Sequence, residues 1–157
     1  MYDVLYIAKW FLNRDRITSS LADSDGVSNL KLQKLLYYAQ GTFLAVKGEK
    51  LFEDDLLAWT HGPVVESVYH AYKAYGYYPI DFDEDYSDAD IADEDKSLLE
   101  DVYQSFAGYS AWGLREMTHN EAPWKETPQG EAIDPVLIKD YFECEIINWG
   151  EGGYAKT

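Results

Sequence analysis

The chain has 157 residues, of which 46% are hydrophobic and 16% aromatic, including five tryptophans and fourteen tyrosines. A chain of this length buries about two-thirds of its unfolded surface, so we expect a single folded domain. The net charge of −16 disfavours direct binding to nucleic acid, because cationic side chains supply most of that affinity. The single cysteine, Cys144, excludes an internal disulfide and favours a cytoplasmic setting. No segment reaches the roughly eighteen apolar residues of a membrane span, so no membrane association is expected.

The negative charge has two interpretations. It can serve only to keep the protein soluble, which is common for acidic proteins. Alternatively, it favours encounter with a basic protein partner, because long-range attraction raises the rate of association.

The first two predicted elements are amphipathic helices. Residues 2–13 repeat apolar side chains at helical spacing. Ser28 is a suitable N-cap for a second helix, and Gly48 is a suitable end. The second helix carries apolar side chains on more than one face, and its small residues Gly41 and Ala45 allow close approach of another element. We therefore expect it to pack on several sides, near the centre of the fold.

The middle of the chain contains an ambiguous segment and a third helix. Residues 49–60 fit a short irregular segment, one helical turn or a small strand pair, and the sequence does not choose among these. Gly62-Pro63 predicts a helix start, because proline at the first helical position lacks only an N–H that would have no partner there. Gly76 is expected to end this helix.

Three more helices complete the predicted fold. Residues 81–95 hold nine acidic residues and no basic one, which predicts a solvated loop. A polar loop is expected over residues 19–26, between the first two helices. A C-terminal tail is expected over residues 146–157, so residues 1–145 form the single domain. The fold class is therefore mainly α, a compact bundle of about six helices with room for a short strand pair near residues 51–60. The further helices are expected over residues 94–106, 111–118 and 135–144, after N-caps at Asp93, Ser110 and Asp134.

The sequence lacks the motifs of common enzymes. Cys144 lies between Glu143 and Glu145, whose carboxylates disfavour the reactive thiolate. There is no serine-nucleophile motif, no P-loop and no dinucleotide-binding glycine motif. Neither an HExxH motif nor paired-cysteine spacing accompanies the three histidines, so we expect no metal and no cofactor.

One face of the second helix carries Lys31, Lys34 and Tyr38, and this face has two interpretations. The lysines can bind a phosphate or an acidic partner. Alternatively, these side chains lie along neighbouring elements, bury their stems and pair with some of the 29 acidic residues.

Three motifs together resemble one protein family. They are KLQKLLYYAQG at residues 31–41, AWxxGPV at residues 58–64 and WxLxxxTH at residues 112–119. In this order and spacing they resemble the Panacea domain, an antitoxin-like family that also includes SocA-like proteolytic adaptors and phage-associated GepA proteins. The resemblance extends from about residue 2 to residue 142.

The resemblance implies a mainly helical protein that is not an enzyme and that neutralises a co-encoded protein toxin by direct binding. Some members of the family deliver the toxin to a Clp-type protease, so a proteolytic adaptor is the alternative function. An enzyme that uses His61, Glu66 or His119 is a third possibility. The motif residues that the resemblance assigns to partner binding or to the fold are Lys31, Gln33, Lys34, Tyr37, Trp59, Gly62, Pro63, Val64, Tyr69, Trp112, His119 and Trp124.

Overall fold

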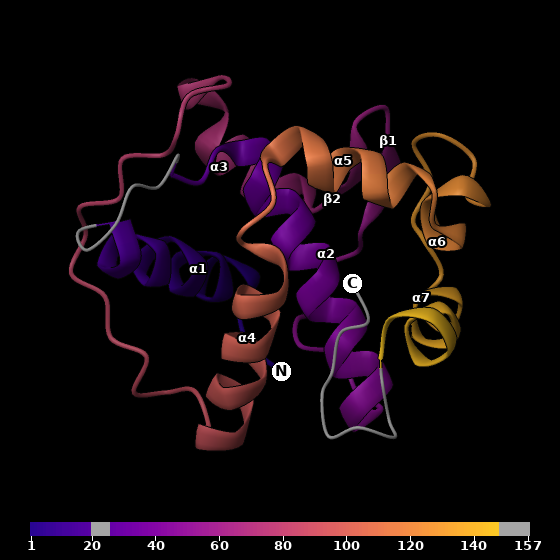
Figure 1. Ribbon diagram of the computed structural model, residues 1–157, viewed down its shortest axis with the longest axis horizontal. Helices are drawn as coiled ribbons and strands as arrows, with labels where there is room; N and C mark the ends of the chain where they lie inside the picture. The colour runs from indigo at the N-terminus through magenta and orange to yellow at the C-terminus, as the bar shows by residue number, and fades with distance from the viewer. Residues whose placement is uncertain (20–25, 148–157) are drawn as a thin grey trace.

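The computed structural model describes residues 1–19 and 26–147 and confirms a mainly α fold with one short antiparallel strand pair (Figure 1). Most of the polar loop expected over residues 19–26 and of the tail expected over residues 146–157 lies outside the described residues, which exclude 20–25 and 148–157. The elements are α1 (Val4–Ser19), α2 (Asn29–Lys47), β1 (Leu57–Trp59), β2 (Gly62–Val64), α3 (Glu66–Tyr72), the 3-10 turn η1 (Lys73–Tyr75), α4 (Asp93–Phe106), α5 (Ala111–His119), α6 (Ala122–Lys125), α7 (Pro135–Tyr141) and the π-helical turn η2 (Phe142–Ile146).

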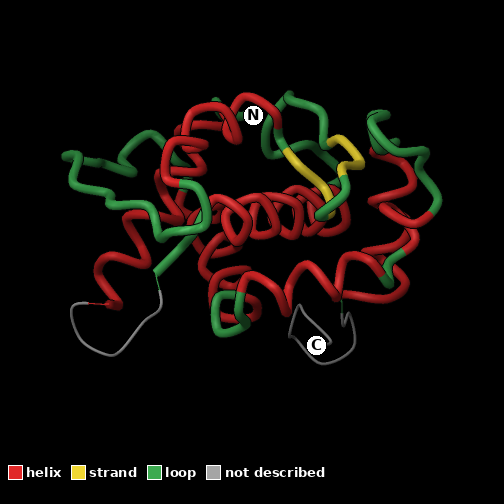
Figure 2. The backbone as a smooth tube through the Cα atoms, turned by 90° about the horizontal axis from the view of Figure 1, so that it is seen from above, coloured by secondary structure: helices red, strands yellow, loops and turns green. Residues whose placement is uncertain are grey.

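Helix α2 runs through the centre of the fold, as the sequence predicts (Figures 1 and 2). The Ser28 side chain accepts a hydrogen bond from the backbone N–H of Lys31, and Gly48 ends the helix in a left-handed conformation. Every residue from 31 to 45 is buried, because α1, α4, α5, α7 and β2 all contact α2. A helix enclosed on all sides must bury its polar side chains as well, so Lys31 and Lys34 are both buried.

Gly41 allows the close approach that its size predicts. A Cβ atom at this position would lie 2.4 Å from the ring of Phe142 in η2. That ring also packs edge-on against Tyr37, with 5.3 Å between the ring centroids. The C-terminal segment is therefore fitted tightly against the central helix, and the buried side chains of Ile146 and Ile147 continue this packing.

The Gly62-Pro63 turn starts a strand, so the predicted helix start at this position is wrong. Residues Gly62–Val64 form β2, which pairs with β1, and α3 begins only at Glu66. Ala58, opposite Pro63, directs its N–H to the carbonyl of Glu131 and its carbonyl to the N–H of Gly130, at 2.9 and 2.7 Å. Both groups thus face away from β2, so the Ala58–Pro63 pair is not hydrogen-bonded and the missing N–H of proline interrupts no ladder bond.

Side chains of α2 cover the outer edge of β2. Lys34 Nζ donates to the carbonyl of Pro63 at 3.0 Å, and Gln33 Oε1 accepts from the N–H of Val65 at 2.8 Å. These two contacts satisfy the backbone groups that a third strand would otherwise bind. The hairpin is thereby fixed to the central helix by buried hydrogen bonds.

Two predicted boundaries differ from the structure. Helix α1 continues to Ser19, six residues beyond the predicted end. The acidic run over residues 81–95 is not uniformly solvated, because Phe82, Ile91 and Asp95 are buried. Helix α4 begins within the run at Asp93 after an N-cap at Ala92 that makes no side-chain hydrogen bond, so the predicted N-cap at Asp93 is wrong. The run is thus anchored at intervals against the body of the protein.

Asp95 explains how an acidic residue can be buried there. Its carboxylate accepts hydrogen bonds from Tyr2 and from Lys47, at 2.6 and 2.5 Å. Burial alone would raise the pKa of Asp95, but the hydrogen bonds from Lys47 and Tyr2 outweigh burial and lower it. The contact joins the N-terminus, the end of α2 and the start of α4.

Candidate partner-binding surface

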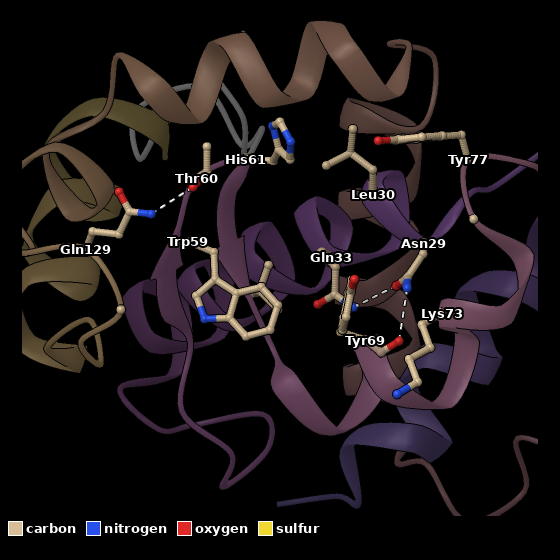
Figure 3. Close-up of a pocket in the computed structure, with 13 residues that line it drawn as sticks. Asn29, Leu30, Gln33, Trp59, Thr60, His61, Tyr69, Lys73, Tyr77 and Gln129 are labelled. Atoms are coloured by element: carbon tan, nitrogen blue, oxygen red, sulfur yellow. Dashed lines mark hydrogen bonds between the residues drawn. The ribbon is translucent and has the colours of Figure 1, made fainter.

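Two pockets lie side by side on the surface near the hairpin and share the ring of Tyr77. The first, the hairpin pocket, has a volume of about 800 Å³ and lies between the β1–β2 turn, the start of α2 and helix α3 (Figure 3). Its lining residues are mostly apolar or neutral polar: Asn29, Leu30, Gln33, Trp59, Thr60, His61, Val64, Tyr69, Lys73, Gly76, Tyr77, Gln129 and Gly130.

Aromatic side chains and a buried polar chain shape the hairpin pocket. Trp59 and Tyr69 meet edge to face with 5.1 Å between ring centroids. Gln33 donates to Asn29 Oδ1, and Asn29 donates to the carbonyl of Tyr69, both at 3.0 Å (Figure 3). Because these contacts tie α2 to α3 and to the hairpin, the pocket exists before any partner binds.

The second pocket, the α4–α5 pocket, has a volume of about 680 Å³ and lies beside the turn between α4 and α5. Tyr109 and Trp112 line it together with Tyr77. The exposed large aromatic side chains of the described residues come from two segments only, residues 75–78 and 109–112. Tyr77 is 91% exposed and Trp112 is 56% exposed. We call these exposed rings, together with the two pockets, the aromatic surface.

Trp112, Arg115 and His61 connect the aromatic surface to the hairpin turn. The guanidinium carbon of Arg115 lies 4.2 Å from the centre of the Trp112 ring, and Arg115 Nε donates to His61 Nδ1 at 2.9 Å. Burial, together with the positive charge of Arg115, lowers the pKa of His61. The lowered pKa favours the neutral imidazole, whose Nδ1 accepts the hydrogen bond from the guanidinium.

His119 and Trp124 contact the backbone of the hairpin at Thr60 and Trp59. The ring nitrogens of His119 lie 2.7 Å from the carbonyl oxygen of Arg115 and 2.9 Å from that of Thr60. The Trp124 indole N–H donates to the carbonyl of Trp59 at 2.8 Å, and its ring centroid lies 3.9 Å from that of His119. Both motif residues position the β1–β2 turn, and their rings are only partly exposed.

The motif residues on α2 are buried. Lys31 donates to the carbonyl of Ala107 at 2.6 Å, and Lys34 donates to that of Pro63. Each lysine is thus hydrogen-bonded to a backbone carbonyl, and the second of the two sequence interpretations, in which these side chains lie along neighbouring elements, describes their burial. Burial, with a smaller contribution from the charge of Arg115, lowers the pKa of Lys34 to about 7. Lys34 has 0% of its surface exposed, so a partner cannot reach it without opening the fold.

Tyr37 and Tyr38 bind a residue that the sequence analysis missed. Their hydroxyls donate to the two carboxylate oxygens of Glu121, each at 2.8 Å. Burial raises the pKa of Glu121 to about 7, although the two hydrogen bonds act in the opposite direction. One glutamate among 29 acidic residues carries no local pattern that marks it as buried, so no sequence feature could have identified it.

The remaining motif residues, Gly62, Pro63 and Val64, are buried in β2. In the described part of the chain, no group of three or more His, Cys, Asp or Glu side chains is arranged to hold a metal ion. No helix there is both long and apolar enough to cross a membrane. Cys144 is exposed in the middle of the π-helical turn η2.

Together the fold and the surface define a class of protein: a compact helical domain whose main surface feature is a preformed, aromatic, largely uncharged area around a hairpin. A family profile described as "Antitoxin SocA-like, Panacea domain" matches residues 32–125, and the chain belongs to this family. This confirms the resemblance seen in the three motifs.

One relative gives a more direct comparison. Antitoxin SocA of Caulobacter vibrioides (strain NA1000 / CB15N) is 50% identical over 50 residues, which is 32% of this chain and 27% of that protein. The match therefore covers well under two-thirds of the relative's length. No solved structure matches the chain significantly.

Proposed function

We propose that this protein is an antitoxin that neutralises a toxin encoded beside it by binding the toxin directly. Membership of the antitoxin family supports the role. The observation that carries the proposal is the concentration of exposed aromatic side chains, Tyr77 and Trp112 among them, beside two preformed pockets. Tyrosine, tryptophan and arginine are the residues that most often dominate binding energy at the centre of protein interfaces.

The charge distribution supports a basic toxin. Asp83 and Asp85 are exposed in the acidic run, whereas Glu84 pairs with Lys9 at 2.8 Å. The run lies beside α1, on the far side of the central helix from β1 and α6 (Figure 1). Its field therefore acts over a long distance and raises the rate of encounter, while the aromatic surface supplies the contact.

A co-expression experiment tests the role. The product of the neighbouring reading frame should arrest growth when expressed alone, and co-expression of this chain should restore growth. Trp112→Ala combined with Tyr77→Ala should weaken binding to the purified toxin by at least 2 kcal/mol, about thirtyfold. Val136→Ala is the control, because this side chain is 62% exposed on α7, outside both pockets.

The same purified components separate direct neutralisation from proteolytic delivery. Inhibition of the toxin by the purified antitoxin alone supports direct binding. Inhibition that appears only when a Clp-type protease is added would replace the proposal with the adaptor function. Unchanged binding by the Trp112 and Tyr77 double variant, with wild-type thermal stability, would refute the aromatic surface as the contact.

A further inference from the structure

The hairpin pocket contains no acidic side chain, although the protein is strongly acidic. Its thirteen lining residues include no Asp or Glu, whereas 29 of the 157 residues in the chain are acidic. The α4–α5 pocket also has none among its lining residues. The centre of the aromatic surface is therefore lined without carboxylates.

Lys73 places a positive charge at the hairpin pocket. Four other lysines of the described residues pair with carboxylates, in the pairs Lys9–Glu84, Lys47–Asp95, Lys96–Asp88 and Lys139–Glu143. Lys73 is exposed and has no ion pair within the described residues. An exposed ammonium group beside an apolar pocket without acidic side chains offers a contact to a carboxylate of a bound partner.

The apolar part of the pocket is suited to a bulky side chain. Trp59, Tyr69, Leu30 and Val64 form its walls, and the Trp59 backbone is held by the indole N–H of Trp124 at 2.8 Å. Preformed apolar walls reduce the ordering cost of binding. The shared residue Tyr77 continues the surface into the α4–α5 pocket, so the space is extended, as a peptide segment requires.

We infer that the hairpin pocket binds a segment of a partner protein that carries an aromatic or branched aliphatic side chain next to an aspartate or glutamate. The apolar side chain lies against Trp59 and Tyr69, and the carboxylate lies against Lys73. The inference rests on the proposed function for the identity of the partner, which is the toxin. A basic toxin is compatible with it, since net charge governs encounter while this contact is local.

Three capped synthetic peptides test the pocket without any toxin. One contains a Leu-Phe-Asp core, the second replaces Asp with Lys, and the third replaces Leu and Phe with Ser. Binding is followed by the indole N–H resonance of Trp59 in the full chain, assigned with Trp59→Phe. The Asp peptide should shift this resonance and bind about threefold to tenfold more tightly than the Lys peptide, and the Ser peptide should not bind.

Charge reversal gives the decisive comparison. Lys73→Glu should make the Lys peptide the tighter ligand. Lys125→Glu changes the charge equally at another exposed lysine without an ion pair in the described residues, on α6 outside both pockets, and should preserve the preference for Asp. Equal affinity of the Asp and Lys peptides, an unchanged preference in Lys73→Glu, or no shift of the Trp59 resonance would overturn the inference.

The peptide experiment tests the pocket assignment and the growth experiment tests the antitoxin role, so either claim can be refuted while the other stands. Peptide selectivity in a chain that neutralises no toxin would refute the antitoxin role and leave the pocket assignment intact. Neutralisation by a chain without peptide selectivity would overturn the pocket assignment and leave the antitoxin role intact.

Discussion

Replacing Gly62 with alanine should destabilise the protein far more than the same change at Gly48. Both glycines have positive φ, +108° and +72°. An L-residue in a left-handed conformation costs about 1–2 kcal/mol, so both substitutions lose that much. A Cβ at Gly48 would meet no atom within 4 Å, whereas at Gly62 it would lie 2.8 Å from both Lys34 Cε and Thr118 Oγ1.

The close approach adds a second cost at Gly62. Moving the Lys34 side chain would separate its ammonium group from the carbonyl of Pro63 and leave two buried polar groups unsatisfied, which costs about 1–3 kcal/mol. We therefore expect a loss of about 1–2 kcal/mol for Gly48→Ala and of about 2–5 kcal/mol for Gly62→Ala.

Urea unfolding at equilibrium measures both losses, and an unchanged m-value shows that the denatured states are comparable. The difference between the two variants should appear as a gap of roughly 2–12 °C in melting temperature. Equal losses in the two variants would show that the hairpin does not depend on the packing of Lys34 beneath Gly62.

Three other measurements test the buried charges and the acidic run. Lys34 has a pKa of about 7 in the folded protein, below its usual 10.5, so the unfolded state holds more protons between these values. The unfolding free energy should therefore rise from pH 7 to pH 10, by up to about 1.4 kcal/mol per pH unit, relative to Lys34→Met. The contribution of Glu121 to the unfolding free energy changes with pH in the opposite direction, because its pKa is raised from 4.5 to about 7 in the folded protein. The wild type should lose stability between pH 4.5 and pH 7 relative to Glu121→Gln, and parallel pH profiles of wild type and variant would contradict either expectation. Replacing Asp83, Glu84 and Asp85 with the corresponding amides should slow association with a basic toxin and flatten the salt dependence of the association rate, with little effect on dissociation. If this variant associates at the wild-type rate at low salt, the acidic run contributes only to solubility.

Local chemistry predicted most of the helices correctly. Ser28, Ser110 and Asp134 each cap a helix through a side-chain hydrogen bond, as the sequence indicates. Each of these caps satisfies an N–H two or three residues away, so its effect is contained within a few residues of sequence. The short helix α6 was missed, since it has only four residues and no side-chain cap.

The Gly62-Pro63 turn was misassigned because distant contacts decide it. Glycine followed by proline and valines fits a helix start and a short strand equally well. The strand forms because β1 is paired on its other side with residues 130–133 and because Lys34 covers the outer edge of β2. Neither contact can be inferred from the residues around the turn.

The candidate site was predicted only in part. Trp59, Tyr69 and Trp112 lie on the aromatic surface, whereas Lys31 and Lys34 are buried against backbone carbonyls. Helical periodicity assigns such lysines to a polar face, and that rule fails when a helix is enclosed on every side. Exposure of Tyr77 depends on how the loop after η1 lies over the start of α2, which periodicity does not describe.

The covered edge of β2 limits how this protein can recognise another chain. Many proteins capture peptides by extending a sheet with one more strand, and free strand edges also lead to aggregation. Here Pro63 offers no N–H, its carbonyl is bound by Lys34, and the N–H of Val65 is bound by Gln33. A partner therefore finds no backbone on β2 to pair with and must be selected by its side chains, and copies of the chain cannot join through this strand at high concentration.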